Sequence, residues 1–181
     1  MKKIIITFLL FTFSLSFSQA QKAPKIVIAA SKNNLKKIQS FVKKGANLDA
    51  QARNKWSALA YAVQNNNLEM VKTLVNGGAN IDLKINTKET PLLMATKGNK
   101  ADIAVFLIDH KANINARDIM ANTPLHWAAK AGNKNLIDKL LSSGADINAK
   151  NISGHTPLDM ASGSVKKLLI EKGAKTSKEL L

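Results

Sequence analysis

The stretch Thr123-Pro124-Leu125-His126-Trp127-Ala128-Ala129 is one copy of a pattern that recurs along the chain. Its leucine and its first alanine each have counterparts in other copies, and one constant spacing separates successive members of both columns. The leucine column is Leu59, Leu92, Leu125 and Leu158, and the alanine column is Ala62, Ala95, Ala128 and Ala161. Independent columns that share one period indicate a chain built from stacked copies of one structural unit.

Each unit carries the signals for two helices. Threonine followed by proline, as in Thr123-Pro124, favours a helix start, because the hydroxyl accepts a backbone N–H and proline there gives up no needed donor. Apolar residues at helical spacing follow in a second segment, such as Ile137, Leu140 and Leu141. Glycine before the last alanine, as in Gly144-Ala145, suits a left-handed helix end. The pattern therefore predicts a turn, a short helix, a turn and a longer helix.

The quoted stretch resembles the signature of ankyrin repeats, and the repeat period of about 33 residues is typical of that family. The similarity extends over about Pro24 to Ala174. It implies an all-α repeat solenoid of five stacked ankyrin repeats, each a helix-turn-helix unit with a finger-like turn. We expect a domain at 21–176, with repeats at about 24–50, 51–83, 84–116, 117–149 and 150–176, and a short tail at 177–181.

The outermost units depart from the pattern in ways that suit the ends of a stack. The first keeps Pro24 but has Lys25-Ile26-Val27 in place of the rest of the signature. The last is shortened, because Gly173 follows Gly144 more closely in the sequence than the repeat period requires. Since terminal repeats need a polar outer face, we expect the first and last units to act as caps.

The first residues predict a cleaved signal peptide at 1–20. Lys2 and Lys3 precede an apolar run at 4–17, and Ser18-Gln19-Ala20 places small residues before the expected cut. The run is shorter than the roughly 20 residues of a spanning helix; the alternatives are a retained signal anchor or a buried helix. We expect a periplasmic or secreted protein with no transmembrane segment after cleavage. The chain has no cysteine, which excludes disulfides and thiolate chemistry.

The chain is strongly basic, with a formal charge of +15 at pH 7, or +13 without Lys2 and Lys3. Arg53 and Arg117 are the only arginines among 27 basic residues, so lysine dominates the charge. Lysine suits solubility and loose attraction better than planar recognition. The charge is interpreted either as a solvated surface or as a preference for acidic partners.

The sequence contains no arrangement typical of an enzyme. His110, His126 and His155 fall in different units, the glycines are scattered, and the carboxylates are spread along the chain. The resemblance implies that His126 makes a structural bond between neighbouring turns. We expect no catalytic residue, no cofactor and no metal site.

The resemblance implies that a partner contacts the finger turns and the exposed side of the first helices. Trp56 stands out as an aromatic residue at a finger, although it could instead fold back on its own repeat. Tyr61, Met94, Trp127 and Met160 form a column that we interpret mainly as stacking core. The candidate partner-binding residues are Arg53, Lys55, Trp56, Lys84, Lys88, Lys97, Arg117, Ile119, Met120, Lys130, Lys150 and Ile152.

These features favour a non-enzymatic protein-binding module of the bacterial envelope or secreted space. We expect a monomer that binds an acidic protein through its concave face of fingers and first helices. One alternative is binding to a polyanion, either nucleic acid or an anionic envelope surface. Specific nucleic-acid recognition is not expected, because an arginine-rich aromatic platform is missing. Another alternative is an inhibitor or immunity protein against a toxin.

Overall fold

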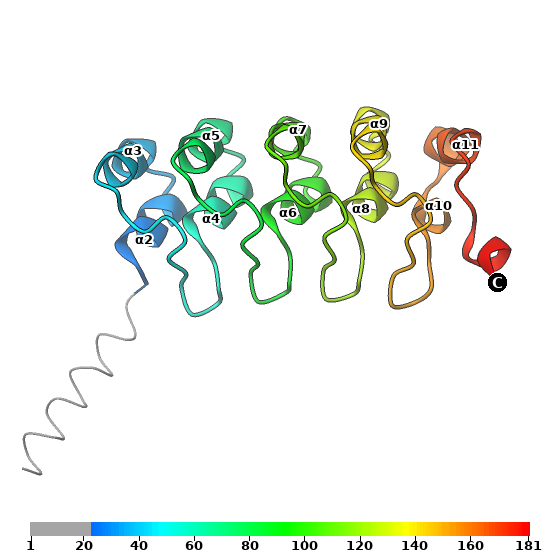
Figure 1. The fold of residues 1–181 in the computed structure, drawn as a ribbon, viewed down its shortest axis with the longest axis horizontal. Coiled ribbons are helices and arrows are strands. Elements are labelled where there is room, and N and C mark those ends of the chain that lie inside the picture. Colours follow the sequence, from blue (N-terminus) through cyan, green and yellow to red (C-terminus); the bar gives the residue numbers. More distant parts are fainter. Residues whose placement is uncertain (1–22) are drawn as a thin grey trace, which may run out of the picture.

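The structure is a computed structural model that describes residues 23–181, so the expected signal peptide at 1–20 lies outside the described residues. Between residues 23 and 181 the α-helices form five consecutive pairs (Figure 1). The pairs are α2 (Lys25–Ser31) with α3 (Leu35–Lys43), α4 (Ala58–Gln64) with α5 (Leu68–Asn76), α6 (Pro91–Lys97) with α7 (Ala101–Asp109), α8 (Pro124–Ala131) with α9 (Lys134–Ser142), and α10 (Pro157–Met160) with α11 (Gly163–Glu171).

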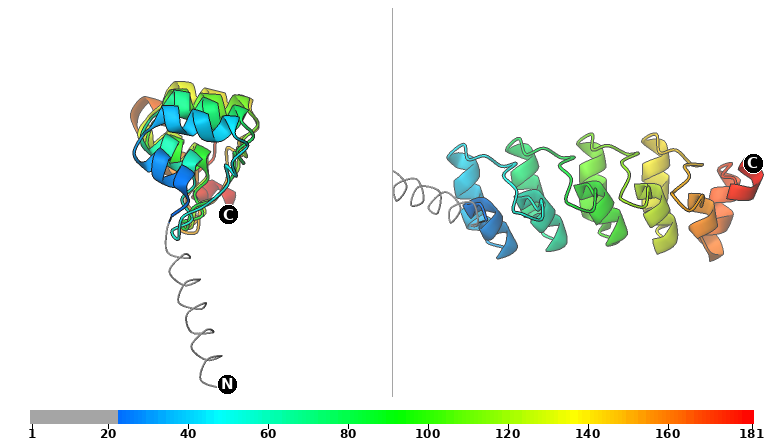
Figure 2. Two further views of the ribbon diagram at one scale, coloured as in Figure 1. Left: turned by 90° about the vertical axis from the view of Figure 1, so that its left-hand side faces the viewer. Right: turned by 90° about the horizontal axis from the view of Figure 1, so that it is seen from below.

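The pairs stack side by side into an all-α solenoid, which confirms the expected fold class. The second helix of each pair lies in an outer layer, and the first helices form a layer beneath it (Figure 1). Successive pairs are joined by loops that project from the helices as fingers, at 51–57, 84–90, 117–123 and 150–156. Seen end-on, fingers and helices meet at an angle (Figure 2). We call the exposed residues of the fingers and first helices the finger–helix face.

The core follows the repeat columns found in the sequence. Leu59, Leu92, Leu125 and Leu158 are all at most 2% exposed. The alanines of the second column are buried as well and let neighbouring first helices approach closely, so α2 contacts α4, α4 contacts α6, α6 contacts α8 and α8 contacts α10. Each helix pair therefore buries apolar surface against its neighbours as well as between its own two helices.

Side chains cap most helix starts. The hydroxyls of Ser57 and Thr90 accept the N–H groups of Ala60 at 3.2 Å and Leu93 at 3.3 Å. The second helices α3, α5 and α9 begin after asparagines whose side chains accept a backbone N–H three residues on. The corresponding position before α7 holds Lys100, whose side chain makes no capping bond. Helix α7 thus lacks a stabilising feature that α3, α5 and α9 possess.

A second column of side chains ties each pair to the next across the loops before the fingers. The Asp49 carboxylate accepts the N–H of Asn80 at 2.7 Å, and the Asp82 carboxylate accepts the N–H of Asn113 at 2.9 Å. The side-chain amide oxygen of Asn115 accepts the N–H of Asp146 at 2.9 Å, and that of Asn148 accepts the N–H of Lys175 at 2.8 Å. We call these four bonds the loop ladder.

The last pair is reduced in its first helix. Helix α10 has four residues, whereas the other first helices have seven or eight. The missing residues therefore come from the end of the first helix. A 3₁₀ helix, η1 (Ser177–Leu180), follows α11, and the N–H of Ser177 donates to the carboxylate of Asp159 at 2.9 Å. Among residues 23–181, no helix combines the length and apolar character needed to cross a membrane.

Candidate protein-binding face

The four fingers share one backbone geometry. Each closes with a bond from its second residue to its sixth, as from Ile85 N–H to Glu89 O at 3.0 Å. The residue before the sixth is left-handed in all four, with φ of 59° at Lys55, 60° at Lys88, 59° at Ala121 and 79° at Gly154. Lysine and alanine in this conformation carry steric strain that glycine avoids. The fingers hold their tips in a fixed shape despite this cost.

Backbone bonds also join neighbouring fingers. The N–H of Ile119 donates to Thr87 O at 3.1 Å, and the N–H of Ile152 donates to Met120 O at 3.0 Å. A longer bond of 3.4 Å runs from Asn86 N–H to Asn54 O. The fingers therefore form one continuous row, and their side chains keep fixed spacings along the stack.

Two residues expected to bind a partner are partly engaged in this row. Arg117 Nη1 donates to the carbonyl of Lys150 at 2.8 Å, just as Gln51 Nε2 donates to the carbonyl of Lys84 at 2.9 Å in an earlier unit. Lys150 is half-buried, and its Nζ donates to Leu180 O at 3.4 Å. Arg117 and Lys150 thus link adjacent units, a role that no pattern in the sequence indicates.

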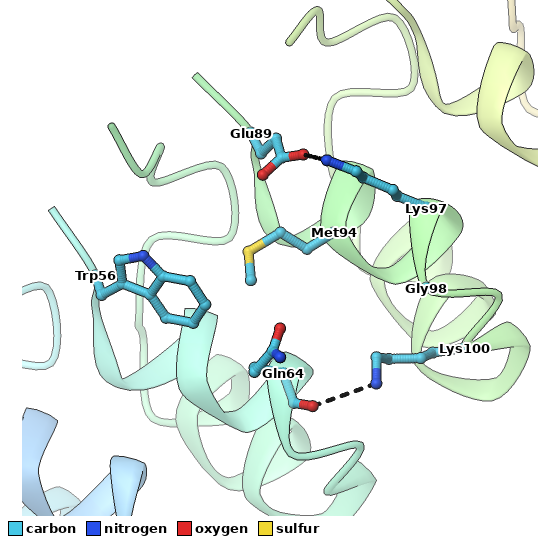
Figure 3. A pocket seen from close by; sticks show the side chains of 7 residues that line it. All are labelled: Trp56, Gln64, Glu89, Met94, Lys97, Gly98 and Lys100. Atoms are coloured by element: carbon cyan, nitrogen blue, oxygen red, sulfur yellow. Dashed lines mark hydrogen bonds and ion pairs between the residues drawn. The ribbon is translucent and has the colours of Figure 1, made fainter. Parts of the chain in front are cut away.

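The apolar candidates divide into two groups. Ile119, Met120 and Ile152 are exposed on the finger tips, by 59%, 47% and 68%. Trp56 is half-buried and folds back on Tyr61, with ring centroids 4.7 Å apart. Trp56 therefore has one side committed to its own repeat and the other turned toward the next unit (Figure 3).

The two carboxylates of the fingers are turned inward. Glu89 is only 8% exposed, and its oxygens meet Lys97 Nζ at 2.6 Å and the Thr87 hydroxyl at 2.8 Å. Asp118 is 7% exposed and accepts the N–H groups of Met120 and Asn122 at 2.8 and 2.9 Å. Neither carboxylate is therefore available to repel an acidic partner.

Cations on the same face stay outward. The side chains of Arg53, Lys55, Lys84, Lys88 and Lys130 are exposed and make neither an ion pair nor a side-chain hydrogen bond within residues 23–181. The ammonium groups of Lys97 and Lys130 also lie 5.2 and 5.4 Å from the ring centroid of Trp127. Cations over an indole face are attracted by its electron density.

A hollow of about 300 Å³ opens where the second and third pairs meet (Figure 3). Trp56 and Glu89 line it from the fingers, and Gln64, Met94 and Lys97 line it from the first helices. Gly98 and Lys100 complete the wall at the end of α6. Apolar surface from Trp56 and Met94 thus lies beside two ammonium groups.

The histidines have structural surroundings. His126 is fully buried: its Nδ1 accepts the N–H of Thr123 at 3.1 Å, and its Nε2 donates to His155 O at 3.1 Å. Burial lowers the pKa of His126 below its ordinary value of 6.5. His155 is exposed, and His110 packs on Phe106. In the part of the chain that the structure describes, no three metal-ligating side chains gather.

Comparison with known families agrees with this architecture. A family model described as ankyrin repeats (3 copies) matches residues 26–118, 77–151 and 117–179, which together span most of the chain. A comparison with curated proteins finds no match. Ankyrin repeats are generally modules for protein–protein interaction and typically have no catalytic activity. With its period, its paired helices and its fingers, the chain belongs to the ankyrin-repeat family.

Proposed function

We propose that this chain is an exported bacterial protein that binds an acidic partner protein through its finger–helix face. Export is supported by the basic start at Lys2 and Lys3, the apolar run at 4–17 and the small residues that follow. The expected location is the periplasm or the secreted space. Binding is the role that the family generally plays.

One observation carries the choice of partner: the acidic side chains of the fingers are buried, whereas basic side chains of the fingers and first helices are exposed. Glu89 and Asp118 are buried and hydrogen-bonded, whereas Lys55, Lys88 and Lys130 are exposed and unpaired among the described residues. The outward field of this face is therefore positive. A face of one sign accelerates encounter with a partner of opposite sign, in a manner that salt weakens.

Capture from an envelope extract at about 150 mM salt tests this proposal. The bait is the chain from residue 21 onward, which contains every helix described above. A face variant changes Lys55, Lys84, Lys88 and Lys130 to Gln. A matched control changes the same number of exposed lysines in the second-helix layer, namely Lys36, Lys37, Lys166 and Lys167.

The expected result is an acidic protein in stoichiometric amount, retained by the native and control baits and lost from the face variant. Equal loss from both variants would mean that total charge matters and the face does not. A mixture of nucleic acid and many proteins, released together by salt, would instead indicate general polyanion attraction.

A further inference from the structure

The hollow between the second and third pairs is a place where the repeat departs from its own pattern. The column that contains Met94 holds Trp127 in the next unit, where the indole N–H donates to Asp118 at 3.0 Å. The Met94 side chain is smaller than an indole and leaves space beside Trp56. Met94 itself is only 8% exposed. The hollow therefore depends on the particular side chain at position 94 and is not a feature that every repeat must have.

Lys100 stands at this hollow in place of a capping asparagine. In the neighbouring pairs, Asn67 and Asn133 cap their helices and also donate to Asn33 at 2.7 Å and to Asn99 at 2.8 Å. Lys100 makes neither contact and instead donates from Nζ to Gln64 O, the last carbonyl of α4, at 3.3 Å. A cation also interacts unfavourably with the start of its own helix. The Lys100 ammonium group therefore lies at the edge of the hollow, and α7 is less stable than it would be with a capping asparagine.

Gly98 and Lys97 complete the surroundings of that ammonium group. A Cβ at Gly98 would lie 2.9 Å from Cε of Lys100 and 3.2 Å from Met94 O, so a larger residue would displace the lysine stem. Lys97 is the second cation of the rim, and Glu89 neutralises only this one, at 2.6 Å. The hollow thus has an apolar floor and a net positive edge (Figure 3).

We propose that this hollow receives an apolar side chain from an acidic segment of the partner protein, whose neighbouring carboxylate pairs with Lys100. The inference rests on the proposed function and specifies its anchor point. Trp56 and Met94 contact the apolar group, because their uncovered surfaces face one another across the space. Lys100 uses one of its three N–H donors on Gln64 and offers the others to a carboxylate. Sites that combine an aromatic anchor with a nearby charge are typical binding hot spots.

Selection from a library of short random peptides tests the anchor. The bait is the chain from residue 21 onward, and the peptides recovered are compared for binding to the native bait, Lys100→Asn, Trp56→Ala and Lys36→Asn. The first change removes the rim cation and restores a capping asparagine, so loss of folding cannot explain loss of binding. Lys36→Asn makes the same change of charge on α3, in the outer layer.

The expected peptides carry Asp or Glu beside an aromatic or large aliphatic residue. Their affinity falls about tenfold for Lys100→Asn and for Trp56→Ala, and stays unchanged for Lys36→Asn. The proposed anchor would be overturned by any of three results: peptides that lack carboxylates, peptides that bind all baits equally, or no enrichment of peptides at all. If the captured whole protein still binds Lys100→Asn but not the four-lysine face variant, the anchor fails and the proposed function stands.

Discussion

The indole N–H of Trp127 donates to the carboxylate of Asp118 at 3.0 Å, and this one carboxylate also closes the finger that precedes α8. A finger and a first helix are therefore held together by a single buried acid. This contact links the finger at 117–123 to α8, and both elements contribute residues to the finger–helix face.

Asp118→Ala is expected to destabilise the fold by about 2–3 kcal/mol, because it leaves the Trp127 indole and two backbone N–H groups without their acceptor. Urea denaturation followed by tryptophan fluorescence measures the change. Asp146→Ala is the control: Asp146 is exposed and accepts only the N–H of Asn148, at 3.0 Å, so its loss costs under about 1 kcal/mol. Equal effects would mean that Asp118 is no more than a turn residue.

Lys100→Asn is expected to raise the free energy of unfolding by about 0.5–1 kcal/mol. The asparagine supplies the missing cap of α7 and a donor to Asn66, as Asn67 supplies one to Asn33. The converse change, Asn67→Lys, removes a cap that is present and is expected to cost a similar amount. Thermal melts of both variants check the pair; a destabilised Lys100→Asn would contradict the view that stability is given up at this position.

Lys88→Gly and Ala121→Gly are each expected to stabilise the protein by about 1 kcal/mol, since both residues are left-handed, with φ of 60° and 59°. Only the first removes a cation from the finger–helix face. Melting temperatures should therefore rise in both, whereas affinity for the acidic partner should fall in Lys88→Gly alone. Parallel loss of affinity in Ala121→Gly would point to finger rigidity rather than charge.

Stability is expected to fall as the pH drops below about 6.5, the unfolded pKa of histidine. Burial holds the pKa of His126 below that value in the folded chain, so the unfolded chain binds a proton first. The stabilisation is complete above about pH 6.5 and is lost as the pH falls through the lowered pKa. Urea midpoints at pH 7.5 and 5.5 measure this, and His126→Gln should flatten the difference.

His155→Gln provides the matched control for that titration, because His155 is exposed and only its backbone carbonyl meets His126. This variant should keep the full pH dependence of the native chain. If His155→Gln abolishes the dependence and His126→Gln does not, the buried ring is not its source.

Much of the fold could be predicted from the sequence because the repeat columns report directly on burial. Leu59 and Leu92 are separated by one repeat period since each occupies the same place in a stack. The orientation of long side chains has no such periodic signal. Trp56 could equally fold back or project, and the structure shows it against Tyr61.

The candidate site was predictable in its placement more than in its chemistry. Ile119 and Ile152 lie exposed on fingers, where the resemblance placed them. Arg117, however, reaches a carbonyl of the next finger, a contact that depends on the spacing between units. The hollow beside Met94 depends on volume left unfilled between two units, and no single column of the sequence encodes it.

The loop ladder bears on how such a chain can change its length. Each of its bonds joins the same pair of repeat positions in adjacent units, as between Asp49 and Asn80 and between Asp82 and Asn113. Duplicating residues 84–116 in tandem would therefore add one bond of the same kind and leave the existing bonds with equivalent partners. Growth by whole units is thus the least disruptive evolutionary route to a longer recognition surface. Because the first and last units differ from the internal ones, new copies are expected to be inserted between them.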